Sequence, residues 1–253
     1  MIDIICIPAP LRRIGALIAL ATGAAHAQSD LKTPVVIELF TSQGCSSCPP
    51  ADRLLEKLAR KPHVIALSLP VDYWDYIGWK DTFASPAFTA RQKGYALARR
   101  DRHVYTPQVV VNGLQHGVGS NYSAIKALAR GTLGHGGALQ VTLKTRLNAG
   151  KLICDLGARA GNAPNKANLW LFRVLKSRQV KIGRGENRGR AVRYVNIVRS
   201  MEKIAAWNGK AKTVAIAKSV LDKGKSEGWI LLLQSGSAER PGEILAAAKS
   251  AGL

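Results

Sequence analysis

The segment TSQGCSSCPPAD, residues 41–52, constrains the fold more than any other part of the chain. It follows TPVVIELFT, a run of β-branched and apolar residues that is typical of a buried strand. It leads into PPADRLLEKLARK, where apolar residues recur on one helical face and the pattern stops before Pro62. Cys45 and Cys48 are therefore expected at the junction between a strand and a helix.

The alternation of strand and helix patterns continues after this junction. HVIALSL predicts a second strand, and SPAFTARQKGYALARRD predicts a helix with Ser85 as its N-cap and Pro86 at its first position. TPQVVVNG and LQHGVG predict two strands joined by a turn at Asn112-Gly113, and SNYSAIKALARG predicts a third helix. Strand–helix–strand segments imply parallel crossovers, so this region is expected to form an α/β domain.

A glycine-rich segment, RGTLGHGG at residues 130–137, separates this region from one with a different pattern. ALQVTLKTRL alternates apolar and polar residues, and later segments are also strand-like: KLICDLGA, NLWLFRVLK, AVRYVNIVRSMEKI, KTVAIAK and GWILLLQ. GEILAAAKS fits either a helix or a strand. We therefore expect an α/β domain over residues 28–134, followed by a mostly antiparallel, sandwich-like β domain over residues 135–253.

The first 27 residues have the pattern of a secretory signal peptide. Arg12 and Arg13 precede the apolar run IGALIALATGAA, and Ala25-His26-Ala27 has the form of a cleavage site. An uncleaved membrane anchor is the alternative, but the apolar run is short for a bilayer span. We expect cleavage after Ala27 and a periplasmic or secreted protein that is not an integral membrane protein.

The chain is strongly basic, with a formal net charge of +21 at pH 7. Such a charge favours anionic partners, so anionic surfaces are one candidate class of partner. No nucleic-acid-binding motif and no basic stretch with interleaved aromatics is found in the sequence, and we expect no nucleic-acid partner. A generally basic, solvated surface is the simpler explanation of the charge.

Export would place the cysteines in an oxidising environment, where a disulfide can persist. Removing the first 27 residues leaves Cys45, Cys48 and Cys154, which suggests one pair and one lone thiol. Cys154 lies in the alternating segment LICDLGA and is expected to be a buried small apolar residue. A thiol at a helix N-terminus faces the positive end of the helix dipole, which favours the reactive thiolate. We therefore expect Cys45 to attack and Cys48 to resolve.

Two alternatives remain for the cysteine pair. A soft thiolate pair can bind Cu(I), although two cysteines leave a tetrahedral ion half coordinated and the histidines show no ligand spacing. The pair can also be a static disulfide in a non-catalytic binding module, although its small loop gives little entropic stabilisation. We expect neither a metal nor a cofactor.

Three further residues are candidate parts of the site. Glu38 lies in an otherwise apolar strand seven residues before Cys45, where a buried carboxylate could carry protons; a polar strand edge is the alternative. Tyr73 and Trp74 belong to the aromatic segment PVDYWDYIGWKDTFA. These rings could bind a partner polypeptide or could pack within the protein.

The order of elements, with CxxC before the first helix and Thr106-Pro107 before the third strand, resembles the thioredoxin fold. The chain is more closely similar to an uncharacterised secreted thioredoxin-like bacterial family, in VVIELFTSQGCSSCPPAD, VDYWDYIGWKD, RQKGYA, VYTPQVVVNG and GENRGR. The resemblance implies thiol–disulfide exchange on exported proteins with cysteines, with Cys45 as nucleophile, Cys48 as resolver and a cis Pro107 facing them. Thr106 and Pro107 would then present their backbone to the substrate and bind it. The resemblance also places Pro70 where members often carry a histidine, so no role for that histidine applies here.

Overall fold

The computed structural model describes residues 34–133 and 139–253. The expected signal peptide over residues 1–27 and the expected domain boundary after residue 134 lie outside the described residues. The elements in chain order are β1 (Val35–Thr41), α1 (Pro49–Ala59), β2 (Val64–Pro70), the 3-10 helix η1 (Asp75–Ile77), α2 (Pro86–Arg99), β3 (Gln108–Val111), β4 (Gln115–Val118), α3 (Tyr122–Gly131), β5 (Leu143–Asn148), β6 (Lys151–Leu156), β7 (Ala167–Lys181), β8 (Ala191–Trp207), β9 (Lys212–Ala217), α4 (Lys218–Leu221), β10 (Gly228–Gly236) and β11 (Pro241–Lys249).

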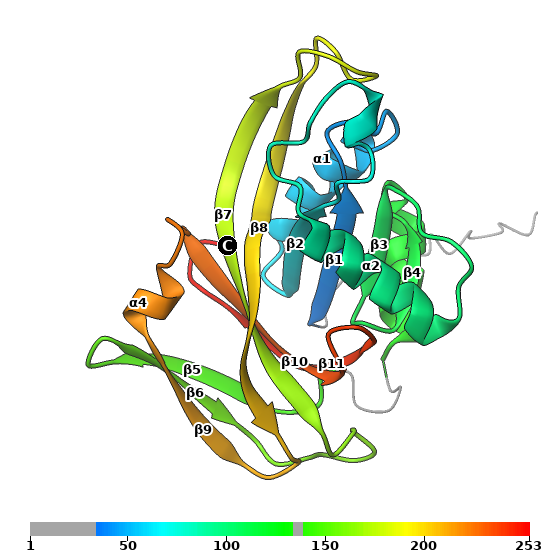
Figure 1. The fold of residues 1–253 in the computed structure, drawn as a ribbon. Helices are drawn as coiled ribbons and strands as arrows, with labels where there is room; N and C mark the ends of the chain where they lie inside the picture. The colour runs from blue at the N-terminus through cyan, green and yellow to red at the C-terminus, as the bar shows by residue number, and fades with distance from the viewer. Residues whose placement is uncertain (1–33, 134–138) are drawn as a thin grey trace, which may run out of the picture. The chain divides into compact units, whose positions relative to one another are not determined.

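The strands form two sheets (Figure 1). The larger sheet has eight strands in the order β11-β10-β7-β8-β2-β1-β3-β4, and the smaller sheet has the order β5-β6-β9. Strand β2 pairs in parallel with β1 on one side and with β8 on the other, while the remaining pairs are antiparallel. The long β7–β8 hairpin thus belongs to the same sheet as the strand that precedes the cysteine pair.

Helices cover both faces of the central strands, because β1 carries apolar side chains on both faces. Val35, Ile37 and Leu39 pack with residues of α1 and α3. Val36 and Phe40 pack on the opposite face with residues of α2 and of β7, β8, β10 and β11. Figure 1 shows α2 crossing the sheet face opposite α1. The strands and helices expected before residue 130 are confirmed, including Ser85 as the N-cap of α2.

The smaller sheet packs on the β10–β11 side of the larger one. Its apolar residues Leu152, Leu156 and Ile216 share a cluster with residues of β7, β10 and β11. Cys154 lies in the same cluster, fully buried and with a free thiol, as the sequence predicted. Burial raises the pKa of this thiol to about 11. Cys154 is therefore an apolar core residue and takes no part in a disulfide with Cys45 or Cys48.

The expected fold class, a thioredoxin-like α/β domain followed by a separate β domain, is wrong. The described chain is mostly β, and β8 continues the sheet of β1 and β2 through the pair Ser68 and Ile197. The Asn196 side chain on β8 also donates to the carbonyl of Ala66 on β2, at 3.0 Å. Periodicity reports which faces of a strand are buried but not which strand lies beside it, so the sequence did not reveal this pairing.

No helix in residues 34–133 or 139–253 is long and apolar enough to cross a membrane.

Candidate functional site

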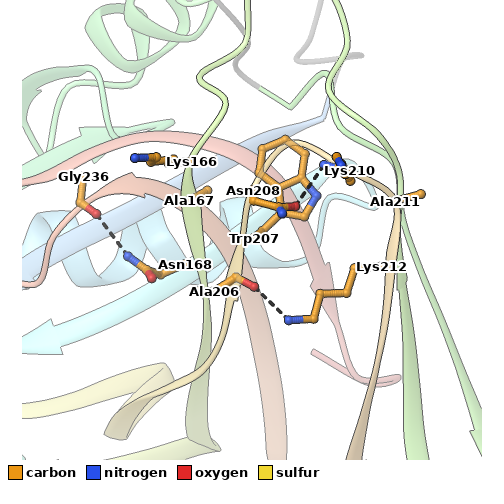
Figure 2. A pocket seen from close by; sticks show the side chains of 10 residues that line it. All are labelled: Lys166, Ala167, Asn168, Ala206, Trp207, Asn208, Lys210, Ala211, Lys212 and Gly236. Atoms are coloured by element: carbon orange, nitrogen blue, oxygen red, sulfur yellow. Dashed lines mark hydrogen bonds between the residues drawn. The ribbon is translucent and has the colours of Figure 1, made fainter.

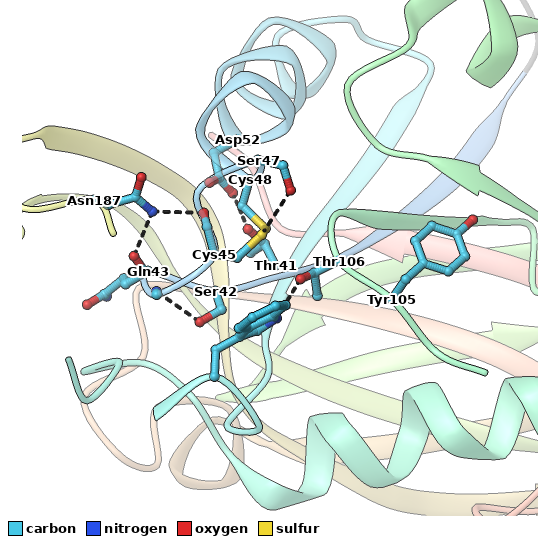
Figure 3. The surroundings of a disulfide bond; sticks show 12 residues. Thr41, Ser42, Gln43, Cys45, Ser47, Cys48, Asp52, Tyr105, Thr106 and Asn187 are labelled. Carbon is cyan, nitrogen blue, oxygen red and sulfur yellow. Dashed lines mark hydrogen bonds between the residues drawn. A yellow bond between two sulfur atoms is a disulfide. The ribbon is translucent and has the colours of Figure 1, made fainter. Parts of the chain in front are cut away.

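Cys45 and Cys48 form a disulfide at the start of α1, with their Cα atoms 5.4 Å apart (Figure 3). Cys48 is the N-cap of the helix, and Pro49 and Pro50 occupy its first two positions. Both cysteines are buried, with 2% of Cys45 and none of Cys48 exposed. The hydroxyl of Ser47 lies 3.3 Å from Cys45 Sγ. The pairing expected from the CxxC spacing is confirmed, but the disulfide is covered by other parts of the chain.

One cover comes from the turn between β7 and β8. The side-chain amide of Asn187 donates to the carbonyl oxygens of Gln43 and Cys45, at 2.9 and 2.8 Å (Figure 3). Arg190 donates in turn to Asn187 Oδ1, at 2.9 Å. Asn187 is buried, so these bonds fix the backbone that carries Cys45. Asn187 lies in GENRGR, a segment shared with the family, but the sequence did not assign it to the site, because 142 residues separate it from Cys45.

The other cover comes from the loop between β2 and α2. The indole nitrogen of Trp74 donates to Thr106 Oγ1, at 2.7 Å. A Cβ atom at Gly44 would lie 3.2 Å from Trp74 Cβ and 3.3 Å from Ile77 Cδ1, so this loop lies against the disulfide loop. Trp74 therefore links the cysteine loop to Thr106.

Tyr73 attaches the same loop to α2. Its hydroxyl donates to Gln92 Oε1 on that helix, at 3.2 Å. Burial raises the pKa of Tyr73 to about 12, and hydrogen bonding to Gln92 and Thr106 opposes the rise. Tyr73 and Trp74, which are candidates for binding a partner, thus both interact with Thr106 within the protein. These contacts favour the packing role that the sequence left open.

The Thr106–Pro107 peptide bond is cis, as the family resemblance implied. Pro107 lies near the first turn of α1: a Cβ atom at Gly119 would be 3.4 Å from Pro107 Cβ and 3.2 Å from Ala51 Cβ. Gly119 also donates its backbone N–H to the carbonyl of Pro107, at 3.0 Å. The fold therefore places the Thr-Pro loop beside the helix that begins at the cysteines.

Glu38 is buried in the middle of β1 and not on a polar edge. Its Oε1 lies 2.6 Å from Arg91 Nε, and its Oε2 accepts a hydrogen bond from Tyr95. Arg91 also donates to Gln234 on β10, at 2.9 Å. Both carboxylate oxygens are thus used within a buried network that joins β1, α2 and β10. A proton-carrying role for Glu38 stays a prediction, although these contacts favour a structural one.

Asp52 is the buried acid that sequence reasoning missed. Its Oδ1 accepts a hydrogen bond from Thr41 Oγ1, at 2.9 Å, while its Oδ2 is buried without a hydrogen-bond partner among the described residues. Burial raises the pKa of Asp52 to about 8, and the nearby charge of Asp81 acts in the same direction. Asp52 therefore holds a proton at neutral pH.

The position of Asp52 connects it to the disulfide. It follows Cys48 by four residues and donates its backbone N–H to the carbonyl of Cys48, at 3.1 Å. Residues with this spacing lie on the same helical face, with Cβ atoms about 5–6 Å apart. The sequence held a signal for this acid, a charged residue one turn after CxxC, but the leucines of the helix form the stronger pattern.

Within the two described ranges, no group of three or more His, Cys, Asp or Glu side chains is arranged to hold a metal ion. The cysteine pair thus has no third protein ligand of these types among the described residues.

Replacing Trp74 with alanine is expected to make the disulfide easier to reach. Loss of the indole removes its hydrogen bond to Thr106 and opens the loop at lower free energy. Each decrease of about 1.4 kcal/mol in the free energy of opening would increase the rate of attack on the disulfide about tenfold. We expect at least a tenfold increase in the rate of reduction by dithiothreitol. Tyr76→Ala is the matched control, because Tyr76 lies in the same loop and is 80% exposed. Equal rates in wild type and Trp74→Ala would show that Trp74 does not limit access.

The chain belongs to the family described as Protein of unknown function (DUF1223), whose model matches residues 36–234. The crystal structure of protein AGR_C_4864 from Agrobacterium tumefaciens is 33% identical, with a TM-score of 0.77; the match covers 89% of this chain and 97% of that one. HBP35 of Porphyromonas gingivalis is 16% identical with a TM-score of 0.53, over 88% of this chain and 76% of that one, and shows similarity of fold alone. No curated protein matches the chain.

Proposed function

We propose that this protein is exported and exchanges disulfides with the thiols of other exported proteins through Cys45 and Cys48. The observation that carries the proposal is the buried Asp52 one helical turn after Cys48; burial raises the pKa of Asp52 to about 8. A carboxyl group without a partner for Oδ2 lowers stability, and a purely structural disulfide has no need of it. An acid with a pKa near the working pH is suited to transfer protons to and from a thiolate.

The exchange begins when a partner thiolate attacks Cys45 Sγ. The Cys45–Cys48 bond breaks, a mixed disulfide forms, and Cys48 leaves as a thiolate that takes the proton of Asp52. A second partner thiolate attacks the partner's sulfur in the mixed disulfide and releases Cys45, which takes a proton from solvent. Asp52 then regains a proton from solvent, to which the partner thiols released theirs. Overall the partner's two thiols lose two electrons and two protons, and the cysteine pair gains two electrons and two protons. The reverse sequence reduces a disulfide in a partner.

One difference in exposure and one contact support Cys45 as the residue that is attacked. Cys45 is the more exposed of the pair, and Ser47, which lies 3.3 Å from its sulfur, is itself exposed. A hydroxyl at that distance can donate a hydrogen bond to the thiolate that forms when Cys45 leaves. Cys48 is fully buried and lies one helical turn before Asp52, which suits the resolving position.

The proposal is tested by thiol trapping of the protein in glutathione buffers of defined potential. A Cys154→Ala background removes the free thiol of the core, and mass spectrometry of the peptide that contains both site cysteines counts alkylated thiols. The pair is expected to be reversible, with a midpoint in the range of known exchange catalysts, about −120 to −270 mV. A pair that stays oxidised throughout this range would contradict the proposal.

A further inference from the structure

The turn between β7 and β8 concentrates positive charge. Its sequence over residues 183–190 is GRGENRGR, with three arginines and one glutamate. Arg184, Arg188 and Arg190 are all exposed, and so is Glu186. Since the arginines outnumber the glutamate, the turn presents a net positive surface to solvent.

This turn borders the disulfide. Asn187 bonds the carbonyl of Cys45, and Arg190 bonds Asn187, so only two hydrogen bonds separate that guanidinium from the cysteine backbone. A Cβ atom at Gly185 would lie 3.3 Å from the carbonyl oxygen of Ile77, so the turn also packs on the loop that covers the disulfide. The arginine-bearing turn therefore lies beside the backbone of Cys45 and beside the loop that covers the disulfide.

Other charges of both signs lie in the neighbouring segments. Arg53, near the start of α1, and Lys80, in the covering loop, are exposed. Asp72 and Asp75 of that loop are half-buried and accept hydrogen bonds from Thr89 and from the backbone of Asp81, respectively. Asp52 and Asp81 are buried, and Asp81 accepts hydrogen bonds from the backbone N–H groups of Gln43, Phe83 and Ala84. Arg53 and Lys80 thus face solvent, while the carboxylates of Asp52 and Asp81 are buried.

We propose that the preferred partners of the cysteine pair are polypeptides whose cysteines are flanked by acidic residues. This proposal rests on the proposed exchange function and specifies its substrate class. Negative charge beside the reacting cysteine is attracted by Arg184, Arg188 and Arg190, which increases the rate of encounter and orients the partner over Cys45. Positive charge at the same positions is repelled.

The test compares two peptides with the same dithiol core, one flanked by glutamates and the other by lysines. At about 20 mM salt we expect the acidic peptide to reduce the Cys45–Cys48 disulfide at least ten times faster, because electrostatic steering changes association rates by about 10 to 1,000-fold. At about 0.5 M salt the ratio should approach one, since the charges are then screened.

Charge reversal locates the effect on the turn. Arg184→Glu/Arg188→Glu is expected to bring the rate ratio near or below one. The control variant Lys210→Glu/Lys212→Glu changes the net charge by the same amount and should leave the ratio of the two rates unchanged.

Lys210 and Lys212 line a cavity of about 860 Å³ beside Ala167 and Trp207 (Figure 2). Ala167 and Trp207 pair at the end of the β7–β8 hairpin that lies away from the turn. Roughly 45 Å of strand separates this cavity from the turn.

The outcomes separate the two proposals. Equal, measurable rates for both peptides in wild type would overturn the preference for acidic flanks and leave the exchange function standing. A ratio lost equally in both double variants would also overturn it, because overall charge and not the turn would then be responsible. Absence of exchange with either peptide would overturn both proposals.

Discussion

Replacing Glu38 with glutamine is expected to lower the free energy of unfolding by about 3 to 5 kcal/mol. The substitution keeps the shape of the side chain but removes the charge that balances Arg91, whose guanidinium is buried. Breaking one partner of a buried ion pair leaves an uncompensated charge, and the loss is typically of this size. Arg91 and Tyr95 also bond Gln234 on β10, so weaker contacts to residue 38 weaken the connection between β1 and β10. Urea unfolding at pH 7 measures the change.

The matched control is Glu56→Gln. Glu56 pairs with Arg60 at 2.7 Å, the same kind of contact, but the Arg60 side chain is 74% exposed. An exposed pair contributes about 0 to 1 kcal/mol, so this variant should unfold nearly as wild type does. Equal losses in the two variants would show that the Glu38 network is not important to stability. If folded Glu38→Gln protein also exchanges disulfides at the wild-type rate, Glu38 carries no protons for the reaction.

Replacing Asp52 with asparagine is expected to stabilise the protein above pH 4 while slowing exchange. The pKa of Asp52 is raised from 3.8 to about 8 in the folded protein. Between these values the folded protein holds a proton that the unfolded chain has released, so wild-type stability falls as the pH rises. The slope from this group is at most about 1.4 kcal/mol per pH unit. This pH dependence ends above about pH 8, where Asp52 is ionised in both the folded and the unfolded protein.

An asparagine side chain does not titrate, so this slope disappears in the Asp52→Asn variant. Near pH 4 the two proteins should be equally stable, and at pH 8 the variant should be more stable by about 2 to 5 kcal/mol. Asp222→Asn, at an exposed carboxylate, is the control and should leave the slope unchanged. Denaturant unfolding at several pH values measures both. Equal wild-type and Asp52→Asn stabilities at pH 8 would show that Asp52 is not held protonated.

Although Asp52→Asn is expected to stabilise the protein, it is expected to slow disulfide exchange. Loss of a positioned acid or base typically slows proton transfer by about 100 to 10,000-fold, and we expect slower release of Cys48 by that order. Stopped-flow mixing with a peptide dithiol measures the rate. A variant that is more stable and also fully active would show that Asp52 has no part in the reaction.

Local patterns were sufficient to predict most elements near the site. The apolar runs located β1 and β2, Ser85-Pro86 located the start of α2, and Asn112-Gly113, both with positive φ, formed the predicted turn. No local pattern predicted which distant strands pair with each other. The segment VIALSLP of β2 is buried along almost its whole length, which requires that both of its faces be covered, but nothing in it identifies β8 as a paired strand.

The same distinction applies to the site. CxxC before a helix and Thr-Pro before a strand are local patterns, and the fold places them beside each other. The bond from Asn187 to Cys45 spans 142 residues and has no counterpart in local sequence. The two buried acids of this region differ in their partners. Glu38 has Arg91 as its counter-ion, while Asp52 has the neutral hydroxyl of Thr41 as its hydrogen-bond partner. The sequence could not separate these two environments.

The central claim is that Cys45 and Cys48 exchange electrons with partner thiols, and the midpoint potential of the pair tests it most directly. Thiol trapping across glutathione buffers is expected to give a reversible two-electron transition between about −120 and −270 mV. A midpoint below about −300 mV, typical of structural disulfides, would contradict the exchange function and make the pair a static crosslink.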